Sequence, residues 1–172
     1  LILLQISAGL HGIALARSED VTKGITILRE TTRSVSEAIG TGNYNTLHVL
    51  WLGEAYARGQ QYKDAMEAAR RALELSRQFN HLTYEGWALR LIGEIAIESD
   101  PLQPATAKDY LRQALALGQK LGMRPLIARC HADLARLYRR SDRSTEADQH
   151  LQTATTMFHE MGMKYWLEQL EA

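Results

Sequence analysis

The sequence is poor in the residues that mark disulfide-rich, collagen-like or strongly charged proteins. Its 172 residues include one cysteine, three prolines and two phenylalanines, and 20 Lys and Arg balance 20 Asp and Glu. A single cysteine excludes an intramolecular disulfide framework and fits a reducing compartment, so we expect a cytoplasmic protein. A net charge of zero provides no general attraction to nucleic acid or membranes, and we predict neither as a partner.

Long hydrophobic runs are also missing. The most apolar stretch, residues 1–16, is interrupted by Gln5, Ser7 and His11. It is shorter than the ~20 apolar residues that a membrane span requires, and no basic stretch precedes it as in a signal peptide. We therefore expect a buried helix there. Because the sequence begins with Leu1 and not with Met, we also expect a fragment of a longer chain.

The sequence does contain a repeat of about forty residues. Small or helix-ending residues recur at intervals of 40 to 42 positions in several series. These series are Gly12, Gly53, Gly93 and Ala135; Gly24, Ala65, Ala107 and Ala147; Thr31, Ala72, Ala114 and Ala154; and Gly40, Asn80, Gly122 and Gly162. Repeats of this length indicate stacked supersecondary units, each burying its apolar face on the next.

Each repeat predicts two antiparallel helices. In the second repeat, residues 45–58 and 62–79 both place apolar side chains at i, i+3, i+4 and i+7, and a polar turn separates them. We expect the small residues to let paired helices cross closely, and the last series to end helices in the left-handed conformation. In the longer turn at residues 98–104, both Pro101 and Pro104 are expected outside the helices.

This pattern resembles the tetratricopeptide repeat (TPR), whose signature is aromatic-x2-Leu-Gly-x2-Tyr, then Ala-x3-aromatic and a further Ala. The second repeat reads Val49-x2-Leu52-Gly53-x2-Tyr56, then Ala65 and Ala72. The fourth reads His131-x2-Leu134-Ala135-x2-Tyr138, then Ala147-x3-Leu151 and Ala154. The leading Trp is missing, and the period is near forty instead of thirty-four.

The resemblance implies an all-α fold, a right-handed α-solenoid of four TPR-like helix pairs and a C-terminal helix. We expect one domain over residues 1–172, with repeats at 1–40, 43–80, 82–122 and 124–162 and a terminal helix at 163–172. The segments 121–131, 137–140, 154–158 and 163–168 also resemble the C-terminal helical-repeat region of bacterial proteins with nucleotide cyclase and ATPase domains.

Motifs for catalysis or cofactor binding are not found in the sequence. It has no P-loop or dinucleotide-binding glycine pattern, and its six histidines are scattered without metal-ligand spacing. Cys130 and His131 are adjacent, so their side chains diverge by about 100° on a helix, and we interpret them as packed residues. Glu94 and Glu98 lie four apart, but Arg90 precedes Glu94 by four, which favours a solvated charge ladder. We therefore predict no enzyme, no cofactor and no metal.

A basic stripe is the most distinctive charged feature. Arg129, Arg136 and Arg140 follow one face of a predicted helix, at i, i+7 and i+11. One interpretation is a solvated face balanced by acids on neighbouring helices. The other is a patch for an acidic peptide, a phosphorylated segment or another domain of the parent chain.

By resemblance, the first helix of each repeat lines a concave groove that binds a protein or peptide. The implied groove residues are Leu47, Leu50, Glu54, Trp87, Arg90, Glu94, Arg129, Arg136 and Arg140. Ordinary core packing is the alternative for the apolar members. Glu54 and Glu94 stand where members that clamp C-terminal carboxylates have Asn, so we expect no binding of chaperone tails.

The C-terminal residues suggest an uncapped end. Tyr165, Trp166, Leu167 and Leu170 would pack on their own partner helix or on another subunit, which predicts a homodimer through exposed end helices. The predicted function is a non-catalytic protein-interaction and regulatory module of a bacterial multidomain signalling protein. The alternative is the effector- or partner-binding repeat domain of a large transcription activator.

Overall fold

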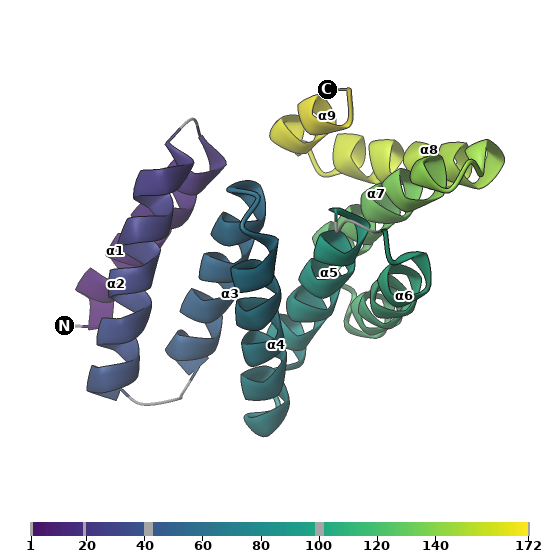
Figure 1. Cartoon of the computed structure of the whole chain (residues 1–172). Helices are drawn as coiled ribbons and strands as arrows, with labels where there is room; N and C mark the ends of the chain where they lie inside the picture. The colour runs from purple at the N-terminus through teal and green to yellow at the C-terminus, as the bar shows by residue number, and fades with distance from the viewer. Residues whose placement is uncertain (1, 19, 40–42, 99–101, 172) are drawn as a thin grey trace. The chain divides into compact units, whose positions relative to one another are not determined.

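The computed structural model describes residues 2–18, 20–39, 43–98 and 102–171. Secondary structure in these ranges is entirely helical (Figure 1). The helices are α1 (Ile2–Arg17), α2 (Val21–Ile39), α3 (Asn43–Arg58), α4 (Tyr62–Gln78), α5 (Leu82–Glu98), α6 (Pro104–Leu121), α7 (Arg124–Arg140), α8 (Ser144–Glu160) and α9 (Lys164–Glu171).

The chain divides into two compact units, Leu1–Leu91 and Ile92–Ala172. In unit 1, α1 packs on α2 and α3 packs on α4, and the first turns of α5 complete the unit. In unit 2, the last turns of α5 precede α6, α7 packs on α8, and α9 contacts α8. The helices are thus arranged as consecutive antiparallel hairpins, as the repeat predicts.

The small residues of the repeat lie where the helices of a pair cross. The described members of the first three series are all buried, including Gly53, Ala72, Ala114 and Ala154. The tightest approach to a backbone atom is at Gly24 on α2, where an added β-carbon would lie 2.6 Å from the backbone nitrogen of Ala16 on α1. The prediction that small residues permit close crossings is confirmed there.

Left-handed residues end the helices at the predicted places. Asn80, Gly122 and Gly162 have φ values of 54°, 66° and 66°. Gly40, the fourth predicted member, lies outside the described residues. Gln60 and Asp142, in the turns within repeats, also have positive φ, although neither was predicted to. Pro104 is the first residue of α6 and not part of the preceding turn, because proline is tolerated in the first helical turn.

The first helix differs from the sequence prediction. Residues Ile2–Arg17 are helical, but Leu3, Leu4 and Leu10 are 82%, 72% and 52% exposed. Only the face with Gly9, Gly12, Ile13 and Ala16 is buried. The expectation of a buried helix is therefore wrong for the opposite face, because α2 and α3 cover α1 from one side only. Among the described helices, none has the length and apolar character needed to cross a bilayer.

Candidate functional site

The basic stripe of α7 lies in a network of ion pairs within unit 2. Arg136 is central to the network: its guanidinium lies 2.6 Å from Asp133, 3.3 Å from Glu98 and 3.6 Å from Glu94. Glu94 and Glu98 are four residues apart on α5 and so present both carboxylates to α7. The two acids therefore face arginines of another helix.

The two flanking arginines of the stripe differ in their exposure. Arg129 is 8% exposed, lies 3.9 Å from Glu94, and places its guanidinium 3.5 Å from the ring centre of Trp166. Arg140 donates a hydrogen bond to the carbonyl oxygen of Ile97 and lies 3.3 Å from Glu98. The stripe thus has three arginines matched by three carboxylates, which supports the interpretation of a balanced face. Arg136 and Arg140 keep partly exposed side chains.

The C-terminal helix covers part of this region. Trp166, Leu167 and Leu170 pack against a buried cluster of Ala128, Ala154 and Phe158. Of the two arrangements expected for α9, packing on the chain's own helices is therefore the one observed. Tyr165 stays 36% exposed. The position of Trp166 over Arg129 joins α9 to α7 by a cation–π contact.

The implied groove residues of unit 1 have different environments. Leu50 is buried, whereas Leu47 and Trp87 are half-buried. Glu54 accepts two hydrogen bonds of 2.9 Å from Arg17, which joins α3 to α1. The guanidinium of Arg90 lies 5.9 Å from the ring centre of Trp87, and Arg90 is only 3% exposed. The expectation that Arg90 belongs to a solvated ladder is wrong, because its helix face is buried.

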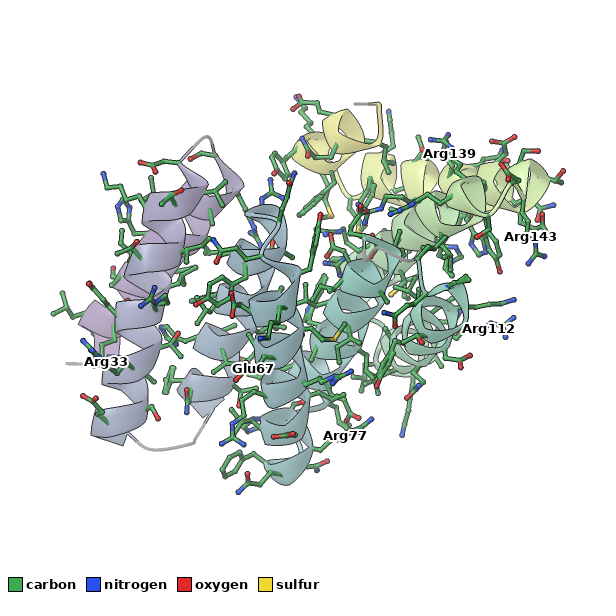
Figure 2. All side chains as sticks on the ribbon, in the orientation of Figure 1. Arg33, Glu67, Arg77, Arg112, Arg139 and Arg143 are labelled. Atoms are coloured by element: carbon green, nitrogen blue, oxygen red, sulfur yellow. The ribbon has the colours of Figure 1, made fainter. Side chains whose placement is uncertain are left out.

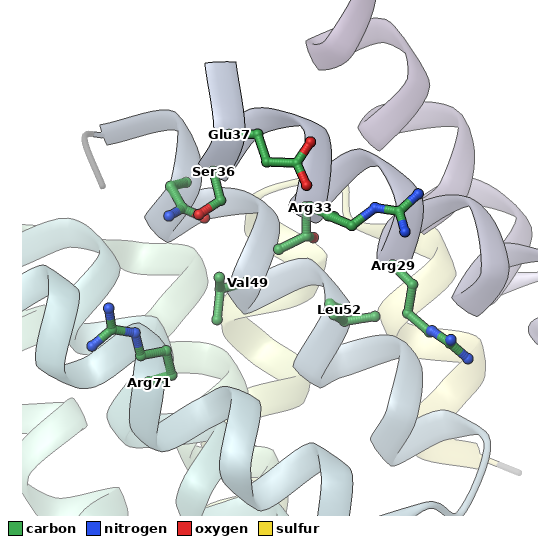
Figure 3. A pocket seen from close by; sticks show the side chains of 9 residues that line it. Arg29, Arg33, Ser36, Glu37, Val49, Leu52 and Arg71 are labelled. Carbon is green, nitrogen blue, oxygen red and sulfur yellow. The ribbon is translucent and has the colours of Figure 1, made fainter. Parts of the chain in front are cut away.

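A polar hollow of about 460 Å³, which sequence reasoning missed, lies on unit 1. Its walls are residues of α2 and α4, and α3 supplies the floor (Figure 3). The lining residues are Arg29, Thr32, Arg33, Ser36, Glu37, Asn45, Val49, Leu52 and Arg71. One wall of the hollow could have been found in the sequence, because the polar residues 29, 32, 33 and 36 have the spacing of one helical face.

Two buried polar atoms of the hollow's lining residues have no hydrogen-bond partner among the described residues. They are Oγ1 of Thr32 and Oδ1 of Asn45. Asn45 is 5% exposed. Leaving a buried polar group unpaired costs about 1–3 kcal/mol, so each of these two atoms is available to a water molecule or a ligand in the hollow.

A histidine pair joins α7 to α8 in unit 2. Nδ1 of His131 lies 2.8 Å from Nδ1 of His150, and the ring of His150 stacks on Tyr138. Burial lowers the pKa of both histidines, and the charge of His150 lowers the pKa of His131 further. The neighbouring Cys130 is buried. No three His, Cys, Asp or Glu side chains of the described ranges are grouped to hold a metal ion.

Comparison with known proteins identifies the repeat. The tetratricopeptide-repeat family model matches residues 50–79, which cover most of α3 and all of α4. No curated protein matches the chain in sequence. Repeats of this type generally bind proteins or peptides on their extended surfaces.

Solved structures show the same fold. A putative kinesin light chain with TPR-like repeats from Podosopora anserina is 14% identical, with a TM-score of 0.69 over 90% of this chain and 74% of its own. The apo form of RapI is 19% identical, with a TM-score of 0.68 over 98% of this chain and 46% of its own. The predicted all-α repeat solenoid is confirmed, and residues 50–79 match the tetratricopeptide repeat.

Proposed function

We propose that the chain is a non-catalytic regulatory module of a bacterial multidomain signalling protein, acting in the cytoplasm. Its partner is a protein or peptide, including another domain of the same parent chain. The resemblance of the last third of the sequence to the helical-repeat region of cyclase and ATPase proteins supports the signalling context. The match of residues 50–79 to the tetratricopeptide repeat supports the interaction function.

The observation that carries this proposal is the partial exposure of predicted groove residues on the first helices of the repeats. On unit 1, Leu47 and Trp87 are half-buried, so each offers apolar surface to a partner. On unit 2, the side chains of Arg136 and Arg140 are 43% and 41% exposed. Aromatic and arginine side chains of this kind commonly contribute most of the binding energy of an interface.

The experiment measures binding between the purified chain and the other segments of its parent protein, produced separately. We expect Arg136→Glu with Arg140→Glu to weaken binding at least about tenfold and to change its salt dependence. Arg139→Glu is the matched control, because Arg139 adjoins Arg140 but is exposed and outside the network (Figure 2). Circular dichroism checks that both variants fold. Unchanged affinity and salt dependence in the double variant would exclude this face of unit 2.

The forty-residue period favours a second candidate, the effector- or partner-binding repeat domain of a large transcription activator. The parent sequence distinguishes the two candidates. Cyclase and ATPase domains would support the signalling protein, whereas an ATPase domain with a DNA-binding helix-turn-helix would support the activator.

A further inference from the structure

The hollow between α2 and α4 has an excess of positive charge. Its charged lining residues are three arginines, Arg29, Arg33 and Arg71, and one carboxylate, Glu37. Arg29 and Arg33 form no ion pair with any carboxylate of the described residues. Arg71 lies 3.2 Å from Glu74, but both side chains are at least half exposed, so this pair is weak and exchanges readily with solvent.

The three arginines flank an apolar floor with a polar edge. Figure 3 shows Val49 and Leu52 between Arg71 on one side and Arg29 and Arg33 on the other. Beside this floor, the carboxamide of Asn45 is buried and its Oδ1 has no hydrogen-bond partner among the described residues. A half-turn of the carboxamide exchanges that acceptor for the donor Nδ2, so Asn45 offers a donor to an anion without moving the backbone.

The polar character of this hollow is not required by the repeat. Where α2 has Thr32 and Arg33, the matching positions of α4 are Leu73 and Glu74, and those of α6 are Leu115 and Ala116. Leu73 is buried, as expected for a position that closes the contact between helices. In α8 the matching residues are Thr155 and Thr156, so a hydroxyl recurs in the fourth repeat, whereas the first repeat alone has a guanidinium at the second of these positions.

We propose that this hollow binds a phosphomonoester. Three arginines and one glutamate give the lining a net charge of +2, which a phosphomonoester dianion neutralises. Guanidinium groups match the geometry of phosphate oxygens in bidentate hydrogen bonds. The volume of about 460 Å³ is within the range of small-ligand sites, so it holds the phosphate and part of the group that carries it.

The phosphomonoester has two sources, a phosphorylated side chain or a free metabolite, and both share the same chemistry. The proposal depends only on residues of α2, α3 and α4. It is therefore independent of the interaction face of unit 2, and the Arg136 and Arg140 variants should bind the phosphomonoester as the parent chain does.

The test is an NMR titration of the intact chain with a capped phosphoserine tripeptide, with inorganic phosphate, and with a capped glutamate tripeptide. We expect saturable binding of the phosphoserine peptide, with shifts at the Asn45 amide and side chain. Arg33→Gln and Arg71→Gln should each raise the Kd about tenfold or more, as the loss of a charge-assisted hydrogen bond does. Arg70→Gln is the matched control, since Arg70 is exposed on α4 and does not line the hollow.

The outcomes separate the two sources and the competing explanations. Tighter binding of the phosphoserine peptide than of inorganic phosphate supports a site for a phosphorylated segment, whereas equal affinity supports a site for a free metabolite. The proposal is overturned by the absence of saturable binding. It is also overturned by a glutamate peptide that binds as tightly as phosphoserine, or by an equal effect of the Arg33, Arg71 and Arg70 substitutions.

Discussion

At Gly24 the helices α1 and α2 lie so close that no side chain fits between them. An added β-carbon would lie 2.6 Å from the nitrogen of Ala16 and 2.7 Å from the carbonyl oxygen of Gly12, both backbone atoms. Gly53 on α3 is less constrained, because the nearest atom there, at 3.1 Å, is a terminal methyl of Leu91. A leucine methyl moves by a rotamer change, whereas the backbone of a packed helix does not.

This difference predicts that the same glycine-to-alanine substitution destabilises the chain at one position and not at the other. Gly24→Ala should lower the free energy of unfolding by about 1–3 kcal/mol, the usual cost of overpacking. Gly53→Ala should be close to neutral, because the gain in helix propensity, about 1 kcal/mol, offsets the tighter packing. Urea unfolding followed by circular dichroism measures both values. Equal losses in the two variants would contradict the close crossing of α1 and α2.

At the scale of secondary-structure elements, α7 and α8 are joined through His131 and His150. Their Nδ1 atoms lie 2.8 Å apart, so one ring donates the hydrogen bond and the other accepts it. Protonation of both rings makes each nitrogen a donor and abolishes this bond. Burial already lowers the pKa of both histidines in the folded state, so folding disfavours their charged forms.

The pair therefore predicts a loss of stability in mild acid. Because the folded-state pKa values lie below the unfolded value of about 6.5, the unfolded chain binds more protons as the pH falls. The free energy of unfolding should be highest above about pH 6.5 and decrease as the pH falls through the folded pKa values. Denaturant unfolding at a series of pH values measures this decrease.

The double variant His131→Gln with His150→Gln should make stability less dependent on pH in that window. His159→Gln is the matched control, because His159 is also on α8 but is exposed and lies outside the pair. A control that flattens the pH dependence as much as the double variant does would show that the pair is not responsible.

At the scale of the whole molecule, the periodic features were predictable and the contacts between distant residues were not. Small residues such as Gly53 and Ala72 permit a close helix crossing, and Asn80 adopts a left-handed turn. These local requirements recur along the repeats and are therefore visible in the sequence. The contact of Arg129 with Trp166 depends on how α9 turns back onto α7, which spacing along one helix does not determine.

The hollow on unit 1 was likewise only partly predictable from the sequence, because its walls come from different helices. One wall, Arg29 and Arg33, was readable as a helical face in the sequence. The opposite wall, Arg71, belongs to another helix, and only the packing of α2 and α4 around α3 brings the two together. In the sequence, the stripe of Arg129, Arg136 and Arg140 looked like the stronger candidate because few acids lie near it along the chain. Apart from Asp133, the acids that balance it lie on another helix, α5.

The exposed face of α1 is the surface on which we expect self-association. Leu3, Leu4 and Leu10 are largely exposed, whereas at the other end of the chain Trp166 and Leu167 pack on their own unit. Removing a leucine side chain from water stabilises an interface by about 1.5–3 kcal/mol. A second copy of α1 would provide an equivalent face, as in two-fold symmetric dimers.

We therefore predict a concentration-dependent dimer that forms through α1. Light scattering and sedimentation over a range of concentrations should show the dimer for the parent chain. Leu4→Glu with Leu10→Glu should weaken dimerisation at least about tenfold, because each glutamate places a charge in an apolar contact. Leu121→Glu is the matched control. Leu121 is also an exposed leucine, at 37%, but it ends α6 and belongs to unit 2, whereas α1 belongs to unit 1. A chain that stays monomeric at high concentration would reject the prediction. A dimer that forms in the parent chain and in the control, but not in the double variant, would support it.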